Sequence, residues 1–213
     1  MAQEEFRTVL HHILRVPFVY NAVQNLVGTA NVKRKVIEIA FSDRMPRSFL
    51  DLGCGTGEII GFIPQELLTG YTGLDINGEY IAHARQRLPP PRYRFVQAGI
   101  ETAAAHFAGE RFDLIYLGGF LHHLNDEQCR SLLSLIPSFL SDRGRLVVMD
   151  PIYSHGQGWL AARLTSMDRG KYVRREDDYL LLLQRSFVHV KPHIFHDLIH
   201  YPHSTQITVC RPG

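Results

Sequence analysis

The chain contains 213 residues, which is the length of one ordinary domain. Apolar residues make up 45% of it and charged residues 21%, a balance that excludes disordered, collagen-like and repeat proteins. The formal net charge is +2, too small to indicate a basic surface for nucleic acid. We therefore expect one globular domain with no nucleic-acid partner.

The three cysteines are far apart and form neither a CxxC pair nor a disulfide framework, which favours a reducing compartment. The N-terminal sequence MAQEEFRTVLHH lacks the charged-then-apolar order of a signal peptide. No run approaches the roughly 18 to 20 apolar residues that a membrane span requires. These features predict a cytoplasmic protein that does not contact a membrane.

Residues 1–45 are predicted to form a helical lid over the rest of the domain. Apolar residues recur there at spacings of three and four, in a stripe that ends before Pro17. The stripe consists of Phe6, Val9, Leu10, Ile13 and Leu14. Two further helices are expected, at residues 18–26 and 32–41.

From Ser48 onward, short apolar runs alternate with helix-length segments. The strand-like runs are residues 49–52, 71–74, 93–96, 112–117 and 145–149, and the helix-like segments lie near 58–62, 78–88, 101–107 and 126–140. Buried strands separated by helices predict a parallel, doubly wound sheet. Residues 46–151 should form this core, which would carry the ligand site.

The last third of the chain predicts a helical insert over residues 152–186 and an antiparallel hairpin over residues 187–213. The hairpin strands are expected near 187–198 and 205–210, joined by a turn at Tyr201–Ser204. The expected fold class is therefore α/β, within a single domain 1–213. Its mostly parallel, Rossmann-like sheet would be closed by the hairpin and covered by the lid.

The strongest functional signal is the segment FLDLGCGTGE, which starts at Phe49. An apolar strand enters a loop with glycines at alternate positions, and a helix then begins. Glycine is needed where the backbone turns tightly near a ligand, and a helix N-terminus favours electron-rich groups. The spacing is GxGxG and not the GxGxxG of the pyrophosphate fingerprint. A ligand-binding loop is favoured over a plain strand-to-helix turn.

Asp75 closes the second expected strand, 20 or so residues after the glycine loop. A carboxylate at a strand end can accept two hydrogen bonds from a vicinal diol and would repel a phosphate. The alternative role for Asp75 is the N-cap of the helix that follows.

The segment Asp51-Leu-Gly-Cys-Gly-Thr-Gly resembles the first motif of class I S-adenosylmethionine-dependent methyltransferases, and the resemblance extends from about Ser48 to Pro151. It implies S-adenosyl-L-methionine as the cofactor, with its ribose on Asp75. The family often has an acidic residue that accepts from the adenine amino group, but this chain has Gly99 there; Glu101 could supply the acceptor. The implied cofactor contacts are Tyr20, Asp51, Gly53, Cys54, Gly55, Asp75, Ile76, Gly99, Ile100, Glu101, Leu117 and Gly118.

The segment LGGFLHHL after the fourth expected strand resembles the family segment that faces the transferred methyl group. A histidine there can act as a general base near neutral pH, so His122 and His123 are catalytic candidates. Only one of two adjacent side chains needs to face the cleft, and either could be satisfied by the surrounding structure. Asp150, at the end of the fifth strand, could orient a histidine, bind substrate or act as a cap before Pro151.

Two peripheral segments also resemble a bacterial small-molecule branch of the family: the lid around Tyr20, and residues 168–174. Tyr20, Arg169 and Tyr172 are therefore candidates for substrate binding. Arg169, with Lys171, Arg174 and Arg175, could clamp an acidic substrate. A solvated helix start explains these charges equally well.

The histidine-rich tail is not expected to bind a metal ion. Its members are His193, His196, His200 and His203, and prolines interrupt the helix that would align them. On a strand, His196 and His200 would be about 13 Å apart.

The preferred interpretation is methyl transfer to a small-molecule acceptor, as O- or N-methylation in secondary-metabolite or sugar biosynthesis. A nicotinamide-dependent oxidoreductase should show GxGxxG and a hydride site, and neither stands out. A noncatalytic S-adenosylmethionine-binding subunit stays open because of Gly99. The acceptor and the oligomeric state are left open, with a homodimer as one candidate.

Overall fold

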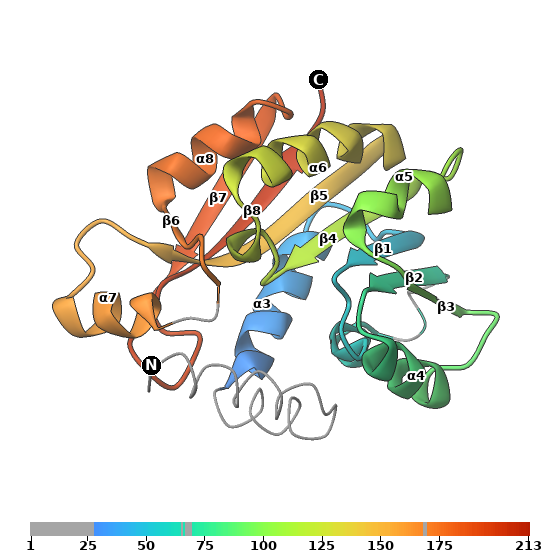
Figure 1. Cartoon of the computed structure of the whole chain (residues 1–213), viewed down its shortest axis with the longest axis horizontal. Helices are drawn as coiled ribbons and strands as arrows, with labels where there is room; N and C mark the ends of the chain where they lie inside the picture. Colours follow the sequence, from blue (N-terminus) through green and yellow to red (C-terminus); the bar gives the residue numbers. More distant parts are fainter. Residues whose placement is uncertain (1–27, 65, 67–69, 168–169) are drawn as a thin grey trace.

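The computed structural model describes residues 28–64, 66, 70–167 and 170–213. Its strands form one sheet in the order β3-β2-β1-β4-β5-β8-β7, and β6 pairs with β5 beside this path (Figure 1). The strands are β1 Ser48–Leu52, β2 Gly70–Asp75, β3 Tyr93–Gln97, β4 Phe112–Gly118, β5 Leu140–Tyr153, β6 Arg174–Arg175, β7 His189–Phe195 and β8 Thr205–Arg211.

The sheet is parallel from β3 to β5, and β8 runs antiparallel to both β5 and β7. The expected doubly wound sheet with an antiparallel C-terminal pair is therefore confirmed. The strand order changes direction between β1 and β4, which are neighbours in the sheet. In such a sheet the ligand crevice should lie beyond the carboxyl ends of these two strands.

Helices cover both faces of the sheet (Figure 1). The α-helices are α3 Thr29–Phe41, α4 Gly78–Arg87, α5 Ala103–His106, α6 Asp126–Phe139, α7 Trp159–Ser166 and α8 Glu176–Gln184; the 3-10 helices are η1 Glu58–Phe62, η2 Ile100–Thr102 and η3 Leu121–His123. One apolar core packs beneath α5, α6 and α8, and a second beneath α3, α4 and η1. No helix in these ranges is long and apolar enough to cross a membrane.

Local sequence signals explain where the helices begin and end. Asn77 caps α4 by accepting from the backbone of Glu79 and Tyr80, and Asn125 forms a capping box with Gln128 at the start of α6. The carboxyl end of α3 is held from β5, because the buried Arg145 guanidinium donates to the carbonyl of Ala40. A positive charge at the carboxyl end of a helix also interacts favourably with the helix dipole.

Three expected elements differ in detail. Residues 58–62 form a 3-10 helix, and the segment near 101–107 is split between η2 and α5. β5 is 14 residues long, much longer than the expected 145–149. Exposed residues early in the strand hide its start, whereas pairing to β4, β8 and β6 holds both ends. The two expected helices before Gly28, and most of the lid, fall outside the described residues.

Candidate functional site

The glycine loop joins β1 to η1 in a conformation that requires glycine. Gly53, Gly55 and Gly57 all have positive φ angles, of 81°, 54° and 72°, which side chains rarely adopt. A Cβ on Gly53 would lie 2.5 Å from the ring of Phe120. The loop therefore contacts the segment that follows β4, where the histidine pair lies.

Asp75 ties this loop to the end of β2. Its Oδ2 accepts from the backbone N–H of Gly55 and its Oδ1 from that of Asn77, both at 2.8 Å. Burial raises the pKa of Asp75, and these backbone donors oppose the rise. Since Asn77 caps α4, the alternative role of Asp75 as an N-cap is wrong. A carboxylate has further lone pairs, so Asp75 can still accept from a diol.

Asp51 is a buried acid beneath the loop. The Tyr71 hydroxyl donates to its Oδ2 at 2.6 Å. Burial raises the pKa of Asp51 to about 7, and the charge of Asp75 adds to the rise while Tyr71 opposes it. Cys54 is also buried, which raises the pKa of its thiol well above the usual range; this thiol is therefore neutral and not nucleophilic.

The side chain of Glu101 folds back toward Gly99. A Cβ built on Gly99 would overlap the Glu101 carboxylate. This carboxylate therefore occupies the space that an acidic side chain at residue 99 would enter. Ile76 follows Asp75 and is 74% exposed. Ile100 is half-buried at the start of η2, whereas Leu117 is fully buried in β4 beside the half-buried Gly118.

His122 and Asp150, expected separately, are in direct contact. His122 Nδ1 is hydrogen-bonded to Asp150 Oδ1, and both residues are buried. Asp150 lies inside β5 and not at a cap. His123 is exposed and does not join this contact, although its ring centroid lies 4.1 Å from that of His122.

The insert packs directly on His122. A Cβ on Gly170 would overlap the imidazole, and Tyr172 N–H donates to the carbonyl of His122 at 2.9 Å. Tyr172 itself is 40% exposed. This contact sets the insert against the histidine that follows β4. Arg169 and Tyr20 lie outside the described residues.

Arg174 has neither of the roles that the sequence suggested. Its buried guanidinium donates to the carbonyls of Leu121 and Leu124 at 3.0 and 2.8 Å and to Asp126 at 2.7 Å. Arg174 is therefore not a solvated charge, and its donors are already engaged by η3 and α6. It fastens the insert to the segment that carries His122.

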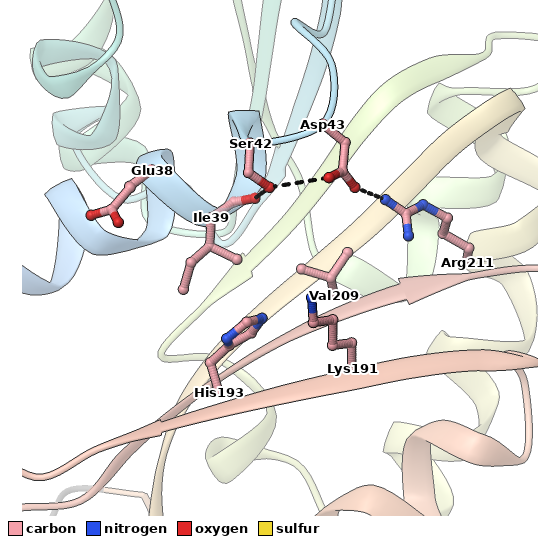
Figure 2. A pocket seen from close by; sticks show the side chains of 8 residues that line it. All are labelled: Glu38, Ile39, Ser42, Asp43, Lys191, His193, Val209 and Arg211. Carbon is pink, nitrogen blue, oxygen red and sulfur yellow. Dashed lines mark hydrogen bonds and ion pairs between the residues drawn. The ribbon is translucent and has the colours of Figure 1, made fainter.

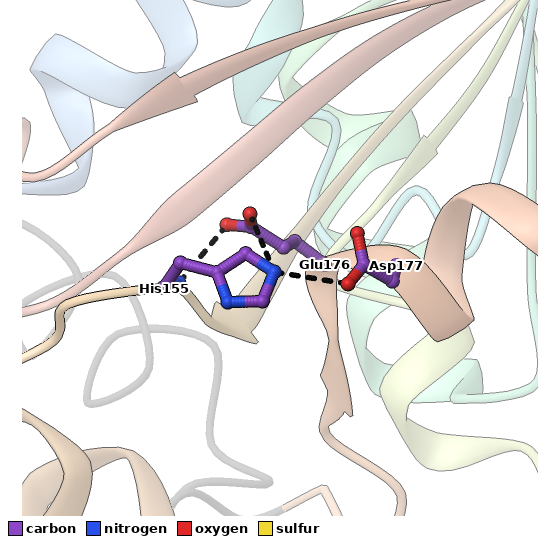
Figure 3. A group of neighbouring side chains, drawn as sticks. All are labelled: His155, Glu176 and Asp177. Atoms are coloured by element: carbon purple, nitrogen blue, oxygen red, sulfur yellow. Dashed lines mark hydrogen bonds and ion pairs between the residues drawn. The ribbon is translucent and has the colours of Figure 1, made fainter.

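Two features lie away from this site. His155 Nε2 is 2.9 Å from Asp177 Oδ2 and 3.3 Å from Glu176 Oε1 (Figure 3), contacts that tie the start of the insert to the start of α8. A groove of about 290 Å³ lies between α3 and the β7–β8 pair (Figure 2). It is lined by Glu38, Ile39, Ser42, Asp43, Lys191, His193, Val209 and Arg211.

Sequence reasoning missed Tyr179, Tyr71 and Gly170. Tyr179 begins a run with four leucines, which reads as an apolar helix face. Tyr71 similarly reads as a strand residue, and Gly170 as an ordinary loop residue. Their contacts with Asp150, Asp51 and His122 become visible only in the fold.

Comparison with known proteins finds similarity to methyltransferases over part of the chain. Residues 49–144 match the family model described as a methyltransferase domain. An uncharacterized methyltransferase of Alkaliphilus oremlandii is 27% identical over 120 residues, which cover 54% of this chain and 50% of that protein. The chain thus matches about half the length of this relative.

Solved structures share the fold at low sequence identity. The N-methyltransferase NodS from Bradyrhizobium japonicum, in complex with S-adenosyl-L-homocysteine, has a TM-score of 0.66 and 17% identity, covering 86% of each chain. Human N-acetylserotonin methyltransferase, in complex with S-adenosylmethionine, has a TM-score of 0.64 and 19% identity, covering 85% of this chain and 52% of its own.

The glycine loop and the mostly parallel sheet with its antiparallel C-terminal pair agree with the class I resemblance. Residues 49–144 match a methyltransferase domain and the chain shares its fold with S-adenosylmethionine-dependent methyltransferases, so the resemblance found in the sequence is confirmed. The complexes of its structural neighbours indicate S-adenosyl-L-methionine as the cofactor.

Proposed function

We propose that this protein transfers a methyl group from S-adenosyl-L-methionine to an oxygen or nitrogen of a small-molecule acceptor, with His122 as general base. The observation that carries the proposal is the buried His122–Asp150 contact. It lies directly after β4, two residues from Phe120, whose ring packs on the glycine loop. A base of this kind would therefore stand next to the loop that binds the cofactor.

The cofactor roles follow the resemblance and the geometry together. Asp75 would accept from the ribose hydroxyls with its remaining lone pairs, and Glu101 would accept from the adenine amino group. Ile76 and Ile100 would flank the adenine ring. The backbone of Leu117 and Gly118 would flank the methionine part, above Asp51 and the loop residues Gly53, Cys54 and Gly55.

S-adenosyl-L-methionine supplies an activated methyl group on a positively charged sulfur. The chain's own contribution is to orient the acceptor, exclude water and remove a proton. Asp150, if ionised, can only accept hydrogen bonds, so His122 donates from Nδ1. The lone pair is then on Nε2, which takes the acceptor proton. A positioned base typically contributes about 10²- to 10⁴-fold to the rate.

The acceptor side is proposed to consist of the helical lid, including Tyr20, and of Tyr172 and Arg169 in the insert. The name of one structural neighbour, N-acetylserotonin methyltransferase, supports a small acceptor. Because the buried pair would provide a base, the proposal favours an acceptor that loses a proton, such as a hydroxyl, over one with a free lone pair.

Calorimetric titration of the full chain tests the cofactor. We expect binding of S-adenosyl-L-methionine and S-adenosyl-L-homocysteine and none of the nicotinamide nucleotides. Release of S-adenosyl-L-homocysteine in the presence of phenols, sugars and amines then tests turnover. His122→Gln should lower turnover at least tenfold with cofactor affinity intact, and His123→Gln much less. Equal turnover in wild type and His122→Gln would exclude the proposed base.

A further inference from the structure

Asp150 is completely buried and makes three hydrogen bonds with residues in the described part of the chain. One joins its Oδ1 to His122 Nδ1, and its Oδ2 accepts from the Leu121 backbone N–H at 3.1 Å and from the Tyr179 hydroxyl at 2.5 Å. A buried carboxylate needs such donors to remain ionised. Of the three, only the Tyr179 hydroxyl comes from outside the segment that follows β4.

Tyr179 reaches Asp150 from α8, in the helical insert. Only 1% of Tyr179 is exposed, and burial together with the charge of Asp150 raises the pKa of its hydroxyl well above the usual range. The hydroxyl is therefore protonated at all working pH values and acts as a donor. Leu182 and Leu183 of the same helix pack in the core beneath it, which fixes the position of the ring.

We infer that Tyr179 is a positioning residue of the His122–Asp150 pair, holding the carboxylate so that His122 keeps its proton on Nδ1 and presents Nε2 to the acceptor. The inference rests on the proposed function for the use made of Nε2. The geometry itself is independent of the acceptor. It makes α8 part of the catalytic apparatus, although this helix is more than 50 residues from His122 in sequence.

Other charged and titratable groups near the pair come from three elements. Arg174 of β6 donates to the carbonyl of Leu121, and α6 contributes Asp126 and Cys129. Burial raises the pKa of the Cys129 thiol to about 11, so this group stays neutral. The ring of His123 lies against that of His122 at a tilt of 41°. On β8, the residue in register with Asp150 is the uncharged Gln206. Tyr179→Phe leaves all of these in place and removes a single hydroxyl.

Histidine-labelled full chain, studied by nuclear magnetic resonance, provides the test without acceptor or cofactor. The His122 signals are assigned by their loss in His122→Gln. In wild type we expect His122 to carry its proton on Nδ1. In Tyr179→Phe the carboxylate loses a donor and stabilises the imidazolium more strongly, so the titration midpoint of His122 should move to higher pH by at least about half a unit.

Tyr71→Phe is the matched control, because it removes another buried hydroxyl that donates to a carboxylate. It should destabilise the fold similarly and leave the His122 midpoint unchanged. Equal midpoints in wild type and Tyr179→Phe would overturn the inference, as would equal shifts in both variants. If Tyr179→Phe fails to fold, the wild-type spectrum still decides, since a proton on Nε2 is incompatible with the assigned role. Cofactor affinity, measured separately, reports on the proposed function alone.

Discussion

The carboxylate of Glu101 lies over Gly99, in the volume that a side chain at residue 99 would enter. The class I resemblance places an adenine acceptor at residue 99, where this chain has no side chain. η2 begins at Ile100 and its first turn brings Glu101 back over the glycine. The chain therefore supplies a carboxylate at the expected place from a residue two positions later.

If Glu101 reads adenine, Glu101→Ala should weaken S-adenosyl-L-methionine binding about 3- to 10-fold, the scale of one net hydrogen bond. The double variant Gly99→Asp/Glu101→Ala should recover affinity, because the overlapping carboxylate is then gone. Calorimetric titration measures both, with the exposed Glu127→Gln as control. Full affinity in Glu101→Ala would show that adenine is held in another way.

Asp75→Ala should weaken cofactor binding by about 1 to 3 kcal/mol, because the ribose hydroxyls lose their acceptor. The backbone N–H of Gly55 also loses its partner, so the glycine loop should become less ordered. Asp75→Asn keeps one acceptor oxygen and is expected to fall between Asp75→Ala and wild type. Affinity is measured by calorimetry. Unchanged binding in Asp75→Ala would show that Asp75 does not bind the ribose.

The buried Asp51 should make stability depend on pH. Its pKa is raised to about 7 in the fold, against about 3.9 in an unfolded chain. Between these values the native state holds a proton that the unfolded state releases, so the contribution of Asp51 is complete below about pH 4 and is lost as the pH rises to about 7. The free energy of unfolding of wild type, relative to Asp51→Asn, should fall by up to about 4 kcal/mol across this window.

Urea unfolding at a series of pH values measures that difference. Asn at residue 51 can still accept from Tyr71, which makes it a matched variant. A difference that stays constant from pH 4 to pH 7 would mean that Asp51 titrates as it does in an unfolded chain.

Gly170→Ala should disturb His122, since the added methyl group would overlap the imidazole. We expect a loss of about 1 to 3 kcal/mol of stability, the usual scale of overpacking. Gly158→Ala is the control: its φ is −62° and no atom lies within 4 Å of a Cβ there. Thermal unfolding measures both. Equal stability of the two variants would show that the insert moves to accommodate the added methyl group at Gly170 without loss of stability.

The strands and the glycine loop were predictable because both depend on local patterns: apolar runs, glycine spacing and an acid at a strand end. His122 and Asp150 were identified as candidates for the same reason. Their contact with each other depends on β4 and β5 being neighbours, and the alternatives for Asp150 could not be separated without the sheet. Arg174 was misassigned because a charged residue before an acidic helix start reads as solvated, and its burial results from packing against η3.

β5 and β6 pair at Ile152↔Arg174 and Tyr153↔Arg175, so the chain leaves the sheet after Tyr153 and returns beside its point of departure. With Arg174 also fastened to η3 and Tyr179 to Asp150, the return is fixed independently of what lies between. Residues between the two pairs can thus change in length and composition without moving His122, as long as Gly170 and Tyr172, which contact it, stay in place. Under the proposed function, this arrangement would let changes in one surface segment alter the acceptor site while the His122–Asp150 contact stays the same.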